Sequence, residues 1–136
     1  MDNLIHSEIT SRIIKSFYQV YNTLGYGFLE KVYENALILE LREKGLKVEQ
    51  QKQINVYYHE NLVGEYFADL IVEDCVIIEL KARESIVEAN ITQLVNYLKA
   101  TEIEVGLLLN FGQKPDYKRK VFSNQRKNLK DFIINP

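Results

Sequence analysis

Residues 67–82 read FADLIVEDCVIIELKA, two apolar runs separated by the acidic pair Glu73–Asp74. The pattern predicts a β-hairpin with a turn over residues 73–75. This turn pairs Leu70 with Ile78 and matches apolar residues with apolar residues along one face of the hairpin. A register shifted by one residue would set apolar side chains opposite charged ones, so we expect the unshifted pairing.

Three charged residues interrupt this hairpin, namely Asp69, Glu79 and Lys81. In the expected register Asp69 lies directly opposite Glu79, and Lys81 follows on the same face. Two carboxylates in that arrangement repel each other. A divalent cation would offset the repulsion, and carboxylate oxygens suit Mg²⁺ or Mn²⁺; Lys81 could also neutralise part of the charge without a metal. The alternative is a solvated Glu–Lys pair at a strand end, but the opposing aspartate favours a functional site.

The remaining sequence predicts an α/β (α+β) fold, a central mixed β-sheet flanked by helices. Apolar residues recur at helical spacing in three segments: 5–24, 28–44 and 86–99. Strands are expected between residues 46 and 81, with turns at 59–61 and 73–74, and in later segments: 103–110 and 121–122. The expected order is α-α-β-β-β-β-α-β. The last residues, 129–134, are expected to form a terminal helix or arm.

Length and composition predict one domain over residues 1–136, with a core over about 5–122. The single cysteine, Cys75, excludes a disulfide within the chain. The sequence has neither a signal-peptide pattern nor an apolar run of bilayer length, so we expect a cytoplasmic protein without membrane contact. The net charge is −2, yet the basic C-terminal segment 114–130 holds seven Lys or Arg and one acid. Such a segment leaves nucleic-acid binding open.

Two helical segments carry further candidate residues. Glu30 lies near the start of the second helix, with Tyr33 and Glu34 on an adjacent face. Gln93 and Tyr97 lie one helical turn apart in the third helix. Taken singly, a helix-start glutamate and a surface Gln–Tyr pair are ordinary structural features.

Together these motifs resemble a known group of proteins. Residues 27–33, GFLEKVY, match the GxxExxY signature for which a family of small bacterial and archaeal proteins is named. Asp69 with residues 79–81, ELK, resembles the D…(D/E)xK motif of the restriction-endonuclease-like, or PD-(D/E)xK, nuclease superfamily. Residues 93–97, QLVNY, look like the QxxxY motif of its lambda-exonuclease-like branch. The position before the aspartate, often proline, is Ala68 here.

This resemblance implies a restriction-endonuclease-like core and metal-assisted hydrolysis of phosphodiester bonds. Asp69, Glu79 and the carbonyl of Leu80 would hold Mg²⁺ or Mn²⁺, and Glu30 would reach the cation directly or through water. Lys81 would orient the attacking water or stabilise charge on the phosphate. Gln93 would position the substrate or the 79–81 strand, and Tyr97 would support Gln93.

Two hypotheses about function follow. The first is a Mg²⁺- or Mn²⁺-dependent nuclease, with DNA favoured over RNA as its substrate. The alternative is a non-catalytic module that keeps a nuclease-like fold to bind nucleic acid or a protein. The basic segment 114–130 and the nine tyrosines favour this alternative, because tyrosines are common at interfaces and in base stacking. The sequence leaves a homodimer open.

Overall fold

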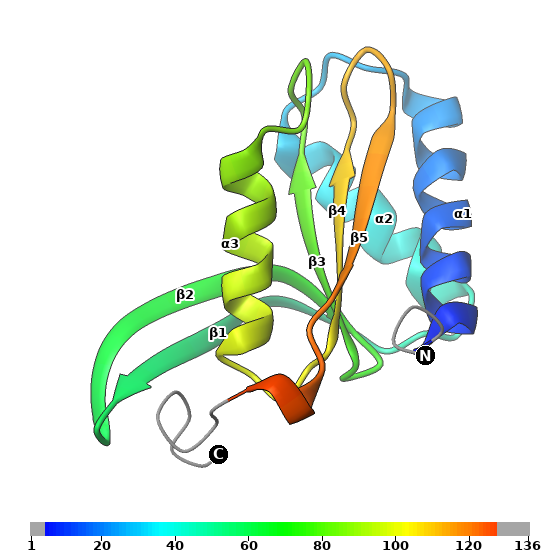
Figure 1. Ribbon diagram of the computed structural model, residues 1–136. Coiled ribbons are helices and arrows are strands. Elements are labelled where there is room, and N and C mark those ends of the chain that lie inside the picture. The colour runs from blue at the N-terminus through cyan, green and yellow to red at the C-terminus, as the bar shows by residue number, and fades with distance from the viewer. Residues whose placement is uncertain (1–4, 128–136) are drawn as a thin grey trace.

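The computed structural model describes residues 5–127 as a five-stranded sheet with helices on both faces (Figure 1). The helices are α1 (Ser7–Leu24), α2 (Glu30–Glu43) and α3 (Glu88–Lys99). The strands are β1 (Val48–Tyr58), β2 (Asn61–Val72), β3 (Val76–Lys81), β4 (Val105–Asn110) and β5 (Asp116–Val121). A short 3₁₀ helix, Asn124–Arg126, follows β5. The expected α+β fold with a central mixed sheet is confirmed.

The sheet runs in the order β1-β2-β3-β4-β5, and only β3 and β4 are parallel. Apolar side chains alternate between its two faces, as the period of a strand requires. On one face, Leu70 and Ile78 pack with the buried stripes of α1 and α2. On the other face, Ile71 and Ile77 pack against Leu94 and neighbouring residues of α3. The central strands are therefore buried on both sides.

The expected order of the strands is wrong in two places. Residues 46–81 form three strands rather than four, because the polar stretch at the start of β1 pairs along β2 without a break into two strands. After α3 the chain forms β4 and then β5, which begins at Asp116 rather than at residue 121. The polar sequence of residues 116–120 hides most of β5, and backbone pairing with the apolar β4 creates this strand. Residues 129–134 lie outside the described part of the chain.

The register expected for the β2–β3 hairpin is confirmed. Leu70 pairs with Ile78, Ile71 with Ile77 and Val72 with Val76. Glu73 and Asp74 take left-handed backbone conformations in the turn. Beyond Leu70 this pairing ends, and β2 continues with β1 as a long hairpin that curves away beneath α3 (Figure 1). Strands β2 and β3 thus separate at the position of Asp69 and Glu79.

Aromatic packing ties the start of α2 to the end of β3. The Tyr33 hydroxyl donates to the carbonyl of Gly25 at 2.7 Å and accepts from the N–H of Phe28 at 3.2 Å. The Tyr33 ring stacks on Phe111 at 4.4 Å between centroids. Phe111 in turn donates its N–H to the carbonyl of Lys81 at 2.7 Å. The tyrosine of the GxxExxY pattern therefore acts as a structural link between α2 and the strand that carries Glu79.

The loop after β4 also fixes the chain that leaves β3. The buried Asn110 side chain accepts from the N–H of Arg83 and donates to its carbonyl, both at 2.9 Å. Gly112 lies against the same carbonyl. A Cβ atom added at Gly112 would come within 2.1 Å of that oxygen.

Among the described residues, none of the helices is long and apolar enough to cross a membrane.

We expect Gly112→Ala to lower the free energy of unfolding by about 1 to 3 kcal/mol, because the methyl group must displace backbone at residue 83. Urea denaturation measures the change. Gly64→Ala is the matched control, since its added Cβ meets only side chains at 3.4 Å or more. Equal stability of the two variants would show that the loop after β4 does not clamp the end of β3.

Candidate active site

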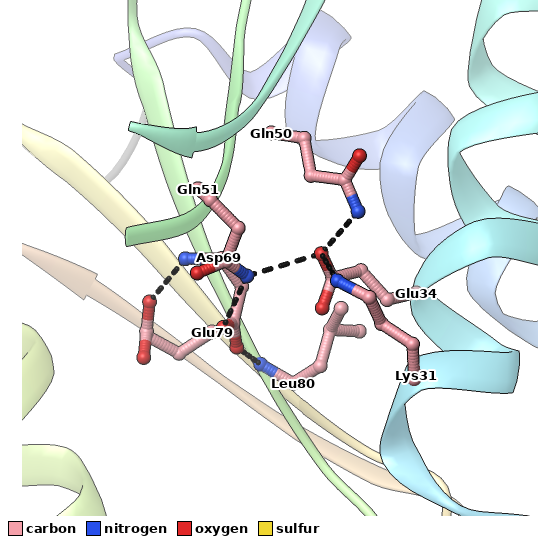
Figure 2. Close-up of polar contacts among 7 residues, drawn as sticks. All are labelled: Lys31, Glu34, Gln50, Gln51, Asp69, Glu79 and Leu80. Carbon is pink, nitrogen blue, oxygen red and sulfur yellow. Dashed lines mark hydrogen bonds and ion pairs between the residues drawn. The ribbon is translucent and has the colours of Figure 1, made fainter. Parts of the chain in front are cut away.

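Where the β2–β3 pairing ends, two acidic side chains continue the connection between the strands (Figure 2). The Asp69 N–H donates to Glu79 Oε2 at 2.8 Å. The Leu80 N–H donates to Asp69 Oδ2, also at 2.8 Å. Each carboxylate thus accepts a backbone N–H from the opposite strand. This reciprocal arrangement fixes both side chains at the point where β2 and β3 diverge.

Burial changes the acidity of this pair. Glu79 is only 6% exposed, and burial followed by the charge of Asp69 raises the pKa of Glu79 to about 8. Burial is also the main reason that the pKa of Asp69 is raised. Lys81 follows at the end of β3 and is half-buried. The charge of Lys81 opposes these increases in pKa but does not cancel them.

A third carboxylate, Glu34 of α2, points toward the pair (Figure 2). It is 5% exposed, and its Oε2 accepts from Gln50 at 2.7 Å and from Gln51 at 3.1 Å. Lys31 lies 3.4 Å away as its ion-pair partner. After burial, the charge of Glu34 contributes further to the raised pKa of both Asp69 and Glu79. Glu34 is therefore a third acid next to the pair, linked to Asp69 through Gln51, and the three acids are called the acidic cluster below.

The Gln51 amide lies between two of these acids. Its Nε2 donates to Glu34 Oε2 and also lies 3.4 Å from Asp69 Oδ1. Gln51 has a left-handed backbone with φ of 51°, which is unusual for a residue other than glycine. Backbone strain of this kind concentrates at functional sites. Here the unusual conformation accompanies an amide donor placed between two acidic groups.

Glu30 begins α2, one helical turn before Glu34. Within residues 5–127 its side chain makes no hydrogen bond or ion pair with Asp69 or Glu79. The structure thus brings Glu34 into contact with the site through Gln51, while the sequence pattern had singled out Glu30. The apolar stripe of α2 carried the missed signal: Glu34 precedes Leu37 by three residues and Leu41 by seven, so it belongs to the buried face.

The other helical pair, Gln93 and Tyr97, lies on α3, which covers the face of the sheet opposite to α2. Gln93 Nε2 donates to the Tyr97 hydroxyl at 2.7 Å along α3. Tyr97 is buried, and burial followed by the charge of Glu79 raises the pKa of Tyr97 to about 12. Tyr97 therefore lies within electrostatic reach of the acidic pair. Gln93 contacts Tyr97 and makes no other side-chain hydrogen bond within the described residues.

The basic segment 114–130 is partly used inside the fold. Arg119 of β5 donates to the carbonyl of Ile5 and lies 3.4 Å from the Thr10 hydroxyl. Lys127 donates to the carbonyls of Thr101 and Ile103 at 2.9 and 2.7 Å. These cations stabilise contacts between distant segments, so the charge excess of the segment is not simply a free binding surface.

The donor set fits a hard divalent cation. Asp69 and Glu79 supply carboxylate oxygens, and Leu80 adds a carbonyl. In a strand the N–H and C=O of one residue point to the same side. Because the Leu80 N–H faces Asp69, its carbonyl also points toward the gap between β2 and β3. Within residues 5–127 no three acidic, His or Cys side chains are already arranged as a metal cluster, which agrees with Gln51 standing between Glu34 and Asp69.

The sequence model of the PD-(D/E)XK nuclease superfamily matches residues 7–121. The chain belongs to this superfamily. The matched residues contain all three α-helices and all five strands described above and leave out only the short 3₁₀ helix after β5. Nucleases of the PD-(D/E)XK superfamily typically use divalent metal ions and act on nucleic acids.

A solved structure titled "Crystal structure of SSO0001" shares the fold, with a TM-score of 0.56 and 17% sequence identity. The alignment covers 69% of this chain and 50% of the other, so this chain spans about half the length of that protein. No curated protein sequence matches the chain significantly. The comparisons therefore identify the superfamily and its fold, while the narrower GxxExxY family is not confirmed.

The raised pKa of Glu79 predicts how stability depends on pH in EDTA. Between the ordinary pKa of 4.5 and about 8, the folded protein binds more protons at Glu79 than the unfolded chain does. The free energy of unfolding should therefore fall as the pH rises through this window, by about 2 to 5 kcal/mol. Urea denaturation between pH 5 and pH 8.5 measures it.

Glu79→Gln keeps a side-chain oxygen to accept the Asp69 N–H but removes the buried charge. We expect this variant to show a flatter pH profile and greater stability than the wild type at pH 8 without metal. Glu65→Gln, an exposed change on β2, is the control and should follow the wild type. A wild-type profile in Glu79→Gln would show that Glu79 is not the buried titrating group.

Proposed function

We propose that this protein is a divalent-metal-dependent nuclease that hydrolyses phosphodiester bonds, with DNA favoured over RNA as its substrate. The observation that carries the proposal is the reciprocal contact of Asp69 and Glu79 where β2 and β3 separate. Glu79 is buried and Asp69 is partly buried, so two facing carboxylates are costly there, and Mg²⁺ or Mn²⁺ would offset that cost. Membership of the nuclease superfamily supports the same function.

Asp69, Glu79 and the Leu80 carbonyl are the proposed metal ligands. A bound cation would polarise the phosphoryl oxygens and lower the pKa of a coordinated water. Lys81, at the end of β3, would hold that water or stabilise the negative charge that develops on the phosphate. Gln93 and Tyr97 would support the opposite side of the site, since their hydrogen bond orders the polar end of each side chain.

Glu34 is proposed as the third carboxylate of the site. Its contact with Gln51, which also reaches Asp69, supports a position next to the cation. Gln51 would donate its N–H to the acids in the absence of metal and yield that place when the cation binds. Glu30 lies one helical turn earlier on α2, and we propose that it reaches the cation through a water molecule.

Cleavage assays test the nuclease directly. Duplex, single-stranded and flapped DNA, together with RNA, are incubated with Mn²⁺, Mg²⁺ or EDTA. We expect metal-dependent cleavage by the wild type and a loss of roughly 100-fold or more in Glu79→Gln, which removes a proposed metal ligand, and in Lys81→Ala, which removes the cation proposed to stabilise the developing charge. Equal cleavage by Glu79→Gln and the wild type would refute the proposal.

The roles of the two helical glutamates can be separated by Mn²⁺ titration calorimetry. We expect Glu34→Gln to weaken Mn²⁺ binding about 10- to 100-fold, the range seen when a group that orients metal ligands is removed. Glu30→Gln, the matched change one turn earlier, should have a smaller effect. The reverse ranking would assign the cation to Glu30 and leave Glu34 a structural role.

A further inference from the structure

A groove lies between α3 and the β1–β2 hairpin, next to the acidic cluster. Its volume is about 730 Å³, within the range of pockets that hold small organic ligands. Val56 and Tyr66 line it from the hairpin, and Gln93, Asn96, Tyr97 and Lys99 line it from α3. Of these, Gln93 and Tyr97 also belong to the candidate active site. The groove therefore continues from that site along α3.

The groove combines an aromatic surface with amides. The ring of Tyr66, which is 45% exposed, lies 5.5 Å from the Tyr97 ring. Asn96 and Gln93 place amide groups on the facing helix. Proteins recognise unpaired bases by stacking them on aromatic rings and by hydrogen bonds from amides to base edges. The groove offers both kinds of contact.

The position of the groove relates it to a nucleic-acid strand. Tyr66 precedes Asp69 by three residues on β2, a distance of about 10 Å along an extended strand. On the other wall of the groove, Tyr97 is close enough to Glu79 for the charge of Glu79 to raise the pKa of Tyr97 further, after the effect of burial. A phosphate held at the acidic pair would thus have an adjacent nucleotide beside the groove. Lys99 and Glu88 place one positive and one negative charge on the lining, so the case for this ligand rests on the aromatic and amide groups rather than on charge.

We propose that this groove binds an unpaired base of the substrate strand, next to the phosphate at the acidic cluster. The inference rests on the proposed nuclease function and narrows its substrate to single-stranded, frayed or flapped nucleic acid. A base inside a duplex is stacked on both faces and reaches such a groove only at the cost of unstacking and unpairing. The bases of a fully paired duplex therefore do not enter it.

The test compares two fluorescein-labelled strands of equal length by anisotropy in EDTA at low salt. One is single-stranded DNA, and the other carries abasic sugars throughout. The wild type should bind the intact strand roughly 5- to 100-fold more tightly, the range for stacking a single base. Tyr66→Ala and Asn96→Ala should reduce this preference, with Tyr66→Ala lowering it to below about twofold, and both should leave binding of the abasic strand unchanged.

Tyr58→Ala is the matched control, because Tyr58 is an exposed tyrosine of the same hairpin that does not line the groove. It should keep the wild-type preference. Equal binding of both strands by the wild type would overturn the inference and leave a protein segment as the next occupant to test. An equal loss for both strands in Tyr66→Ala would also overturn it, because Tyr66 would then not distinguish a strand with bases from a strand without them.

These results separate the groove from the nuclease. If cleavage depends on Glu79 but Tyr66→Ala keeps the preference for intact strands, the nuclease stands and the groove inference fails. If the protein cleaves none of the substrates but Tyr66→Ala abolishes the preference, the groove binds a base and the nuclease proposal fails.

Discussion

The exchange of hydrogen bonds between Asp69 and the backbone of β3, and between Glu79 and the backbone of β2, is the constraint on which the site depends. Pairing between the strands ends at Leu70, and the two side chains replace the missing backbone contacts. The separation lets β2 curve away beneath α3 (Figure 1). Two acids that would repel each other in a regular ladder each accept a backbone N–H from the opposite strand, at the cost of removing their charge from water.

The rest of the fold keeps this junction in place. Tyr33 stacks on Phe111, whose N–H holds the carbonyl of Lys81. Tyr33 belongs to α2, and the buried face of α2 also carries Glu34. Packing against α1 and α2 covers one face of the sheet, and α3 covers the other. One packed core therefore sets the positions of groups that are distant in sequence.

Two surfaces meet at the acidic cluster. Glu34 and Gln51 approach Asp69 from the side of α2 and β1 (Figure 2). Tyr97 lies on α3, within electrostatic reach of Glu79. The first surface is rich in carboxylates and amides and suits a cation. The second is aromatic and continues into the groove beside the β1–β2 hairpin. A phosphodiester bond next to an unpaired base is a ligand that would use both surfaces.

The sequence by itself determined the β2–β3 register, because apolar residues must face the core and a shift by one residue would bury charges. It also determined three helices and the mixed sheet, whose periodic patterns are strong. Only the tertiary structure decided that residues 48–58 form one continuous strand, β1, and that the basic residues of β5 form a strand, since both depend on pairing with a neighbouring strand. The same holds for Gln51, which reaches Glu34 and Asp69 only after α2, β1 and β2 have packed, a contact between segments that no local pattern encodes.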